Sequence, residues 1–172
     1  IQNSVKGICV AAGADVSADA RKLFGETFQC SEMMDDYRDL LKTDVDAVSV
    51  CLPTGLHAEA VVAAAEAGKH VFCEKPVALK IEEARAMDGA AKKSGRKFMV
   101  GHVVRFFPQY IRVRELAFAG DIGEIVMARL YRGGSFPSHG IDNWFADIDK
   151  SGGVFVDLSI HDFDFLRKLL GP

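Results

Sequence analysis

A lysine stands where it could polarise an oxygen atom, in the motif Glu74-Lys75-Pro76 that directly follows the apolar run His70–Cys73. Such a run is typical of a buried strand, and the proline restricts Lys75 to an extended conformation. An ammonium group held at a strand end can polarise a carbonyl or alkoxide oxygen, or hold a phosphate. An isolated lysine is more often a solvated loop residue, so the assignment depends on other motifs at the same edge of the sheet.

A second motif, Pro53-Thr54-Gly55-Leu56-His57, follows the apolar run Ala47–Leu52 and opens an expected helix. In an open parallel sheet, ligands bind beyond the carboxyl ends of the strands, and helix N-termini there present free N–H groups to anions. Proline and glycine are also ordinary turn residues, so position rather than composition makes this segment a candidate binding site.

The third candidate is the pair Asp157 and His161, which follows Gly152 and Gly153. If a helix spans these residues, the two side chains are four positions apart and share a face. A carboxylate beside an imidazole can orient the ring and stabilise its protonated form, as general acid-base catalysis requires. The alternative is an ordinary surface ion pair.

Several classes of protein are disfavoured. The remaining histidines lack the spacing of a catalytic metal site, and the sequence has neither a Gly-x-Ser-x-Gly elbow nor a Walker-type phosphate loop. The net charge is -3 with scattered Lys and Arg, which gives no reason to expect nucleic acid. No apolar run approaches the roughly 18 residues of a membrane helix, and no leader is recognisable, so we expect a cytoplasmic protein.

The four cysteines lack zinc or redox spacing. All of them fall in apolar segments, and cysteine is among the most frequently buried residue types. We therefore expect four buried free thiols in a reducing compartment.

The order of expected elements predicts an α/β fold, because short apolar runs alternate with longer amphipathic stretches. The predicted strands are Ile8–Ala12, Ala47–Leu52, His70–Cys73 and Phe98–Val104, with a weaker one at Thr27–Cys30. The predicted helices are Ser17–Phe24, Ser31–Leu41, His57–Ala67 and Lys80–Ser94. This alternation predicts right-handed crossovers and a doubly wound parallel sheet.

The pattern changes after Arg105. A helix is expected over Phe106–Ala119, a turn at Gly120–Gly123, and a more amphipathic strand over Glu124–Arg132, which indicates an open, mainly antiparallel sheet. A long loop, Gly133–Lys150, carries the only tryptophan, and a helix lies within Ser151–Leu170. We place a domain boundary near residue 120, which gives domains 1–120 and 121–172.

The ordered motifs together resemble the glucose-fructose oxidoreductase / inositol dehydrogenase (Gfo/Idh/MocA) family. They are Asp46–Val48, Pro53–Glu59, Ala67–Val71, Glu74–Pro76, Arg105-Phe106, Gly120–Ile125 and Gly152–Asp162. The resemblance implies an N-terminal Rossmann domain followed by an α+β substrate domain, with NAD or NADP as cofactor. It also implies hydride transfer between the nicotinamide and a secondary alcohol of a sugar or polyol such as inositol, and a homo-oligomer in the full-length parent protein.

The resemblance also implies roles for particular residues. Lys75 would hydrogen-bond the reacting oxygen, His161 would exchange its proton, and Asp157 would orient the substrate hydroxyls or the imidazole. Trp144, on the long loop, is a plausible wall of the substrate site. The residues expected along the cofactor are Pro53, Thr54, His57, Glu74, Lys75 and Arg105.

The dinucleotide fingerprint Gly-x-Gly-x-x-Gly is absent, since no two of the sixteen glycines are separated by a single residue. The segment from Val5 aligns with the second strand of a Rossmann fold, and Asp15 is only a displaced candidate for its ribose-binding acid. We therefore expect the first, central strand to be missing, so that the strands at Ile8 and Ala47 lack the partner between them. The parent protein is then expected to be active, and this chain alone is not expected to bind NADH at micromolar concentration.

Two other functions stay open. One is a glycosidase of the same fold that uses tightly held NAD for transient oxidation, which would retain its cofactor without net formation of NADH. The other is a binding module that has lost its nucleotide site, which would not require Lys75, Asp157 and His161.

Overall fold

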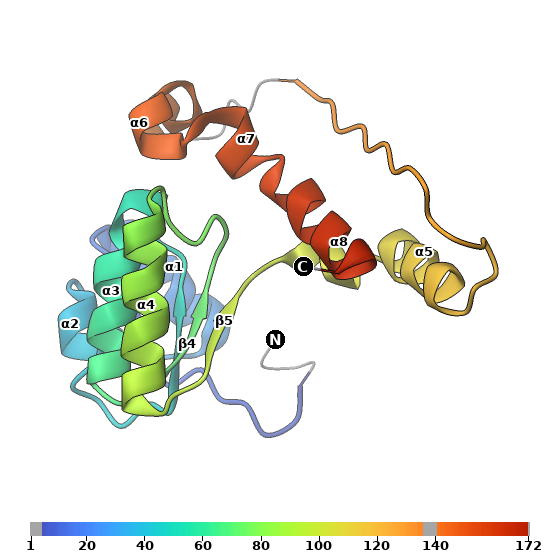
Figure 1. Cartoon of the computed structure of the whole chain (residues 1–172). Helices are drawn as coiled ribbons and strands as arrows, with labels where there is room; N and C mark the ends of the chain where they lie inside the picture. Colours follow the sequence, from blue (N-terminus) through green and yellow to red (C-terminus); the bar gives the residue numbers. More distant parts are fainter. Residues whose placement is uncertain (1–4, 136–140, 172) are drawn as a thin grey trace. The chain divides into compact units, whose positions relative to one another are not determined.

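The computed structural model describes residues 5–135 and 141–171. Strands alternate with helices as far as β5, and helices follow it (Figure 1). The strands are β1 (Ala12–Ala14), β2 (Glu32–Met34), β3 (Ala47–Val50), β4 (His70–Cys73) and β5 (Phe98–Val100). The α-helices are α1 (Ala18–Phe28), α2 (Tyr37–Leu40), α3 (Thr54–Glu66), α4 (Ile81–Ser94), α5 (Pro108–Phe118), α6 (Ile148–Ser151), α7 (Gly153–Asp157) and α8 (Ile160–Leu170). Two 3-10 helices are η1 (Val103–Phe106) and η2 (Ile141–Ala146), and the predicted α/β class is confirmed.

The strands form two sheets. β1 pairs with β2 in parallel, and the other sheet has the order β3–β4–β5. Val71 N–H donates to Lys97 O, and Gly101 N–H donates to Cys73 O, each at 2.8 Å. The hydrogen-bond partners thus advance in the same direction along β4 and β5, as in a parallel pair. Within the described ranges β1 and β3 do not pair with each other.

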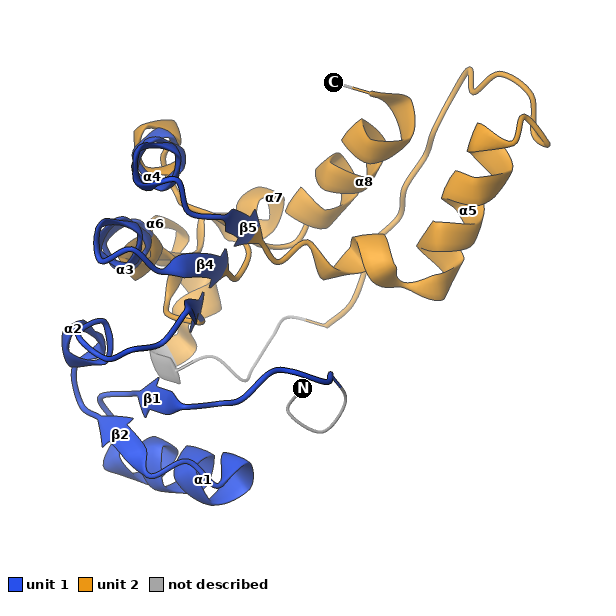
Figure 2. Cartoon of the chain, turned by 90° about the horizontal axis from the view of Figure 1, so that it is seen from below, with its two compact units in different colours: residues 1–50, 58–72, 85–99 blue, residues 51–57, 73–84, 100–172 orange. Residues whose placement is uncertain are grey.

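Helices α3 and α4 lie side by side (Figures 1 and 2). The face that α3 buries repeats with helical spacing and consists of Ala60, Val61, Ala64 and Ala65. Met87 and Ala91, one turn apart on α4, are also buried, together with Val50 and Val71 of the sheet. This apolar core fixes β3 and β4, whose carboxyl ends lead into the candidate site.

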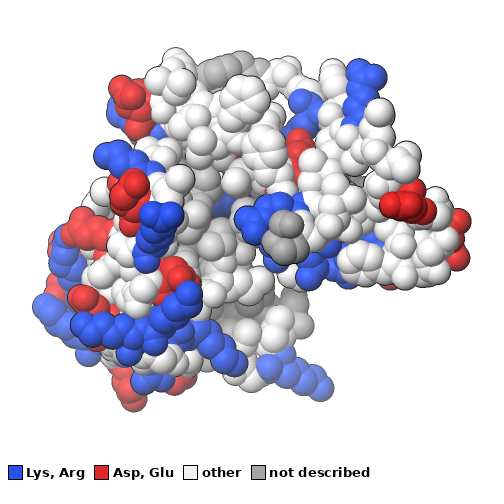
Figure 3. All heavy atoms as spheres, in the orientation of Figure 1, with Lys and Arg blue, Asp and Glu red and all other residues white. Residues whose placement is uncertain are grey.

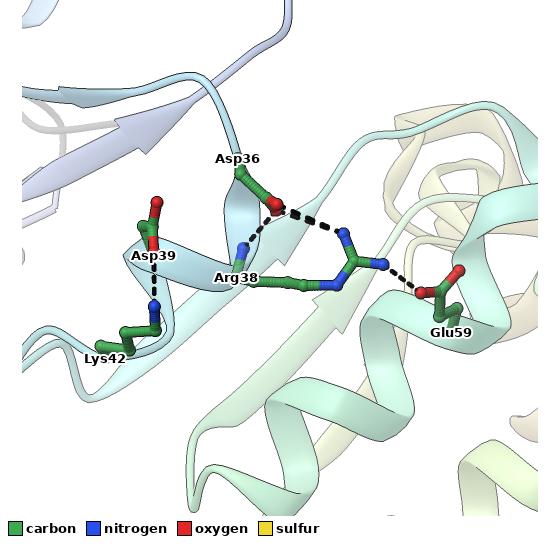
Figure 4. Close-up of polar contacts among 5 residues, drawn as sticks. All are labelled: Asp36, Arg38, Asp39, Lys42 and Glu59. Atoms are coloured by element: carbon green, nitrogen blue, oxygen red, sulfur yellow. Dashed lines mark hydrogen bonds and ion pairs between the residues drawn. The ribbon is translucent and has the colours of Figure 1, made fainter.

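Charged side chains connect α2 to α3 (Figure 4). Arg38 donates to Asp36 Oδ1 at 3.3 Å and to Glu59 on α3, while Lys42 Nζ lies 2.6 Å from Asp39 Oδ1. Asp36 also caps α2 by accepting a hydrogen bond from the Arg38 N–H. Because these side chains are exposed, the pairs orient α2 but add little to stability.

The chain divides into two compact units (Figure 2). Unit 1 comprises residues 1–50, 58–72 and 85–99, and unit 2 comprises residues 51–57, 73–84 and 100–172. The loops that follow β3 and β4 therefore belong to the same unit as α7 and α8. On the face shown in Figure 3, basic side chains lie among acidic ones. No helix in the described part of the chain is long and apolar enough to cross a membrane.

The segment between Thr27 and Leu41 differs from the prediction. The expected strand Thr27–Cys30 is wrong, because α1 continues to Phe28 and ends at Gln29 in a left-handed conformation, with φ 53°. The expected helix Ser31–Leu41 is also wrong, since the segment contains β2 and the short α2. Main-chain pairing with β1 determines β2, and this pairing outweighs local helical periodicity.

The predicted strand Glu124–Arg132 is not formed within the described residues, and neither is an antiparallel sheet. Val126, Met127 and Tyr131 have exposed fractions between 84% and 92%. A strand requires a neighbouring ladder of main-chain hydrogen bonds, which alternating hydrophobicity alone cannot supply. The expected long loop Gly133–Lys150 contains η2 and the start of α6, and its residues 136–140 lie outside the described ranges.

The prediction of four buried thiols is half correct. Cys30 and Cys73 are buried, but Cys9 and Cys51 are exposed. Cys9 precedes β1 and Cys51 follows β3, so neither lies within a strand as predicted. Burial raises the pKa of the Cys73 thiol to about 12, which keeps it protonated and unreactive near neutral pH.

Candidate active site

His57 joins the loops that follow β3 and β4 within unit 2. Its Nδ1 lies 2.9 Å from Pro76 O and its Nε2 lies 2.7 Å from Leu52 O. The residue is only 1% exposed. Both ring nitrogens face main-chain carbonyl oxygens, which can only accept a hydrogen bond. His57 thus holds the main chain on either side of the predicted site, and its contact with a cofactor stays a prediction.

Lys75 is directed onto the chain at the end of α7. Its Nζ donates to the Asp157 carboxylate Oδ1 and to the Asp157 main-chain oxygen, each at 2.9 Å. The Lys75 and Asp157 side chains are 23% and 16% exposed. An ammonium group has three N–H donors, so these contacts leave one for a ligand oxygen. The structure therefore brings together two of the predicted catalytic residues, which are 82 positions apart in the chain.

A single helix does not carry both Asp157 and His161. α7 ends at Asp157, and α8 begins at Ile160. Across this break the Ser159 N–H donates to Val154 O, five residues back, at 2.9 Å. The wider turn alters the expected geometry, in which residues four positions apart share a face. The Asp157 carboxylate contacts Lys75 instead of the imidazole ring predicted as one of its partners.

His161 is 8% exposed, and its Nδ1 is a buried atom without a hydrogen-bond partner among the described protein groups. Burial lowers the pKa of His161, and the positive charges of Lys75, Arg132 and His102 lower it further, while Asp162 opposes this shift. The ring is therefore neutral near pH 7 and can accept a proton.

The segment that contains Arg132 is anchored on α8. Arg132 Nη2 donates to Asp162 Oδ1 at 2.7 Å and to the Tyr110 hydroxyl at 3.1 Å. Tyr110 in turn packs edge-on against Phe165, with ring centroids 4.7 Å apart. Because Asp162 adjoins His161, this anchor also fixes the first turn of α8.

Gly152 connects α6 to α7, and its substitution by alanine is expected to destabilise the fold. Its φ is 74°, and an added Cβ would lie 2.6 Å from Val156 Cβ. A left-handed alanine costs about 1–2 kcal/mol and overpacking adds about 1–3 kcal/mol. We expect Gly152→Ala to lower the free energy of unfolding by at least about 2 kcal/mol, measured by urea denaturation.

Gly89→Ala is the matched control for that measurement. Gly89 lies inside α4, and an added Cβ would meet no atom within 4 Å. Alanine is favoured over glycine in a helix by roughly 0.5–1 kcal/mol, so this variant is expected to be more stable. Equal stabilities of the two variants would contradict the role assigned to Gly152.

Arg105 follows β5 and pairs with α8. Its Nε donates to Asp164 Oδ2 at 2.6 Å, and its Nη2 donates to Asp164 Oδ1. His102 Nε2 lies 3.8 Å from Asp164 Oδ1. These three residues, with Arg167 and Lys168, line an open hollow of about 480 Å³. The predicted contact of Arg105 with a cofactor stays a prediction.

The other predicted residues come from the chain after β3, from the chain after β4 and from η2. Thr54 is buried at the start of α3, and Pro53 is exposed just before it. Glu74 Oε2 accepts the Lys75 N–H at 3.1 Å. Trp144 lies in η2, and its ring packs on Phe145 with centroids 5.0 Å apart. The contact of Trp144 with substrate stays a prediction.

Two features were not recognised from the sequence. β1 ends at Ala14, so Asp15 directly follows the strand and is not displaced. Its Oδ1 accepts the Ser17 N–H at 2.8 Å. His102 is one of the histidines without metal-site spacing, although it follows an apolar run, which is the signal that singled out Lys75. The described residues contain no group of three or more side chains suited to a metal ion.

Family models match both the N-terminal and the C-terminal part of the chain. A model described as an oxidoreductase family with an NAD-binding Rossmann fold (GFO_IDH_MocA) matches residues 1–102. A second model, the GFO/IDH/MocA C-terminal domain, matches residues 110–172.

Individual relatives agree with these matches. The chain is 43% identical over 129 residues to inositol 2-dehydrogenase of Rhizobium meliloti, a match that covers 74% of this chain and 37% of that protein. It is 38% identical over 137 residues to scyllo-inositol 2-dehydrogenase (NAD(+)) of Bacillus subtilis, with 80% and 39% covered. The crystal structure of myo-inositol 2-dehydrogenase from Lactobacillus plantarum has a TM-score of 0.86 and 30% identity, with 97% and 50% covered.

The chain spans less than half the length of these two curated relatives. The Rossmann-type match nevertheless extends over residues 1–102, and the similarity continues through the predicted catalytic residues. The chain therefore belongs to the Gfo/Idh/MocA oxidoreductase family, as its ordered motifs predicted.

Proposed function

We propose that the whole protein is an NAD-dependent oxidoreductase that transfers a hydride between a secondary alcohol of a sugar or polyol and the nicotinamide. The observation that carries this proposal is the Lys75–Asp157 pair in the same unit as the buried His161, whose Nδ1 has no partner among the described protein groups. The inositol dehydrogenases among the relatives support the substrate class.

The residues present fit a nicotinamide cofactor. Buried Thr54 follows β3 and Glu74 follows β4, so neighbouring strands deliver polar groups at their carboxyl ends, where nucleotides bind in such sheets. Pro53, Thr54, His57, Glu74, Lys75 and Arg105 are the residues proposed to hold it. When bound, the nicotinamide ring supplies the hydride acceptor or donor.

Lys75 is proposed to stabilise charge on the reacting oxygen, and His161 is proposed to transfer its proton. The free N–H of Lys75 donates to the substrate oxygen and stabilises negative charge that develops there. Neutral His161 takes the hydroxyl proton during alcohol oxidation and returns it during reduction. Asp157 holds the ammonium group in place through Oδ1. Its other carboxylate oxygen can accept a hydrogen bond from a substrate hydroxyl. Trp144 is proposed as a wall of the substrate site.

NAD rather than NADP is the proposed cofactor because Asp15 directly follows β1 in unit 1. An acidic side chain at the end of this strand accepts hydrogen bonds from the adenosine ribose hydroxyls and repels a 2′-phosphate.

The test is to add NAD and a panel of inositols and sugars to the whole protein and follow the formation of NADH. Deuterium at the reacting carbon is expected to appear in the NADH and to slow the first turnover. NADH is expected to bind more tightly than NADPH in a fluorescence titration. Retained NAD without net NADH, but with hydrolysis of glycosides, would replace this proposal with the glycosidase, and loss of both activities would leave a binding module.

Three further properties belong to the same proposal. The two family matches cover residues 1–102 and 110–172, and the division into domains 1–120 and 121–172 remains a proposal. A reducing, cytoplasmic location is proposed as well, supported by the buried thiols of Cys30 and Cys73. A homo-oligomer is proposed for the whole protein, and its size in solution can be measured by light scattering.

A further inference from the structure

The proposed reaction leaves a proton on a buried residue. Oxidation of a secondary alcohol moves the hydride to the nicotinamide and the hydroxyl proton to His161, so each turnover produces ketone, NADH and one proton. His161 is only 8% exposed. Its proton must reach solvent before the ring can act as a base again, and the structure has to supply a route.

We propose that His102 carries this proton between His161 and solvent through the open hollow that it lines. This inference rests on the proposed function, but it concerns a residue that neither the motifs nor the family resemblance assigned a role. In each turnover the proton leaves His161, is taken up by His102, and is released to water in the hollow, so both rings return to the neutral form.

The first support is the position of His102. It directly precedes η1, and its side chain is 18% exposed. Its ring lies 3.8 Å from Asp164, which is three positions after His161 on α8. Residues three apart on a helix are surface neighbours, so His102 lies against the face of α8 that carries His161.

The second support is the pair of imidazole nitrogens without partners. The Nδ1 atoms of both His102 and His161 are buried and have no hydrogen-bond partner among the described protein groups. Buried polar atoms are normally satisfied by protein or by ordered water, and water can bridge them. One of these nitrogens belongs to the buried ring and the other to the ring that borders the hollow, and the proposed path runs between them.

The charges around His161 favour movement of a proton away from it. Lys75, Arg132 and His102 lower the pKa of His161, and Asp162 opposes them. A positive charge on His102 disfavours one on His161, so the two rings compete for a proton.

The charges around His102 act on its pKa in opposite directions. Burial lowers the pKa of His102, and so do the charges of Arg105 and Lys75, while Asp164 raises it. Arg167 and Lys168 also border the hollow. The cations beside His102 lower its affinity for a proton, so a proton taken up by the ring is passed on to water.

His102→Gln in the whole protein tests the proposal. The first turnover of alcohol oxidation is expected to proceed at the normal rate, because His161 is still neutral. Later turnovers are expected to be at least tenfold slower at neutral pH, with KM for the alcohol unchanged, so that a burst of NADH appears. Added imidazole is expected to restore kcat, and Lys92→Gln, an exposed change on α4, is expected to show neither burst nor imidazole dependence.

Two outcomes with this variant overturn the proposal: normal steady-state turnover, or a first turnover slowed as much as the later ones. A measurement without cofactor gives independent evidence, since NMR titration of the histidine rings is expected to show a higher His161 pKa in His102→Gln. An unchanged value would mean that the two rings do not interact.

A last measurement needs no variant and remains decisive if His102→Gln does not fold. In heavy water, kcat of the unmodified protein is expected to fall, while the first turnover is affected less. Equal isotope effects on both would contradict the relay, because the transfer of the proton through His102 to water would then not limit turnover. Absence of NADH formation by the unmodified protein would instead contradict the proposed function itself.

Discussion

Lys75→Ala is expected to lower kcat for alcohol oxidation by at least about two orders of magnitude, measured as NADH formation by the whole protein at saturating alcohol. In the native protein, the contacts to Asp157 leave one ammonium N–H for the reacting oxygen. The negative charge on that oxygen is greatest in the transition state, so loss of the donor reduces kcat more than it changes KM.

The same substitution has a structural consequence that must be separated from the chemical one. Asp157 is 16% exposed and would lose its cationic partner. Leaving a partly buried carboxylate unpaired is destabilising, so a lower melting temperature is also expected. NADH binding by the folded variant, measured by fluorescence, is the control for a formed site.

Lys80→Ala is the matched lysine control, because Lys80 is exposed just before α4 and lies outside the proposed site. It is expected to keep the native kcat. If Lys75→Ala folds, binds NADH and turns over at the native rate, then the assignment of Lys75 to the reacting oxygen is wrong.

Much of the sheet could be predicted because its strands are determined by local sequence. The apolar runs at β3, β4 and β5 are nearly continuous, and glycines with positive φ follow α3 and α4 at Gly68 and Gly95. β2 was missed because it has only three residues and is specified by pairing with β1. A strand was predicted at Glu124–Arg132 because the segment has alternating hydrophobicity. It does not form there because no neighbouring strand among the described residues supplies main-chain hydrogen bonds.

The candidate site was predictable residue by residue but not as an arrangement. Motif order identified Lys75, Asp157 and His161, yet no local pattern indicates that Asp157 contacts Lys75 across 82 positions. A periodic pattern also does not reveal the break between α7 and α8, which depends on how the main chain turns at Leu158 and Ser159. The role of His57 in holding two loops was missed as well, since both of its contacts are with main-chain carbonyl oxygens.

His161→Gln tests the proposed proton transfer from the alcohol hydroxyl. This substitution is also expected to lower kcat by about two orders of magnitude or more near pH 7. The ring must be neutral to accept the hydroxyl proton. In the native protein the rate is therefore expected to fall as the pH drops through the His161 pKa, which burial and nearby cations place below its ordinary value of 6.5. In the variant this acid limb is expected to disappear from the pH profile of kcat/KM.

The lowered pKa of His161 also makes folding depend on pH, and this gives a second, activity-independent readout. Between the folded and ordinary pKa values the unfolded chain binds more protons than the folded one, so stability is expected to fall as the pH drops below about 6.5. His161→Gln should flatten that decline in a series of thermal melts. His70→Gln, a histidine change in unit 1 where the ring accepts the Lys97 N–H, should keep the native acid limb of the activity. An acid limb that persists in His161→Gln would assign the proton transfer to another group.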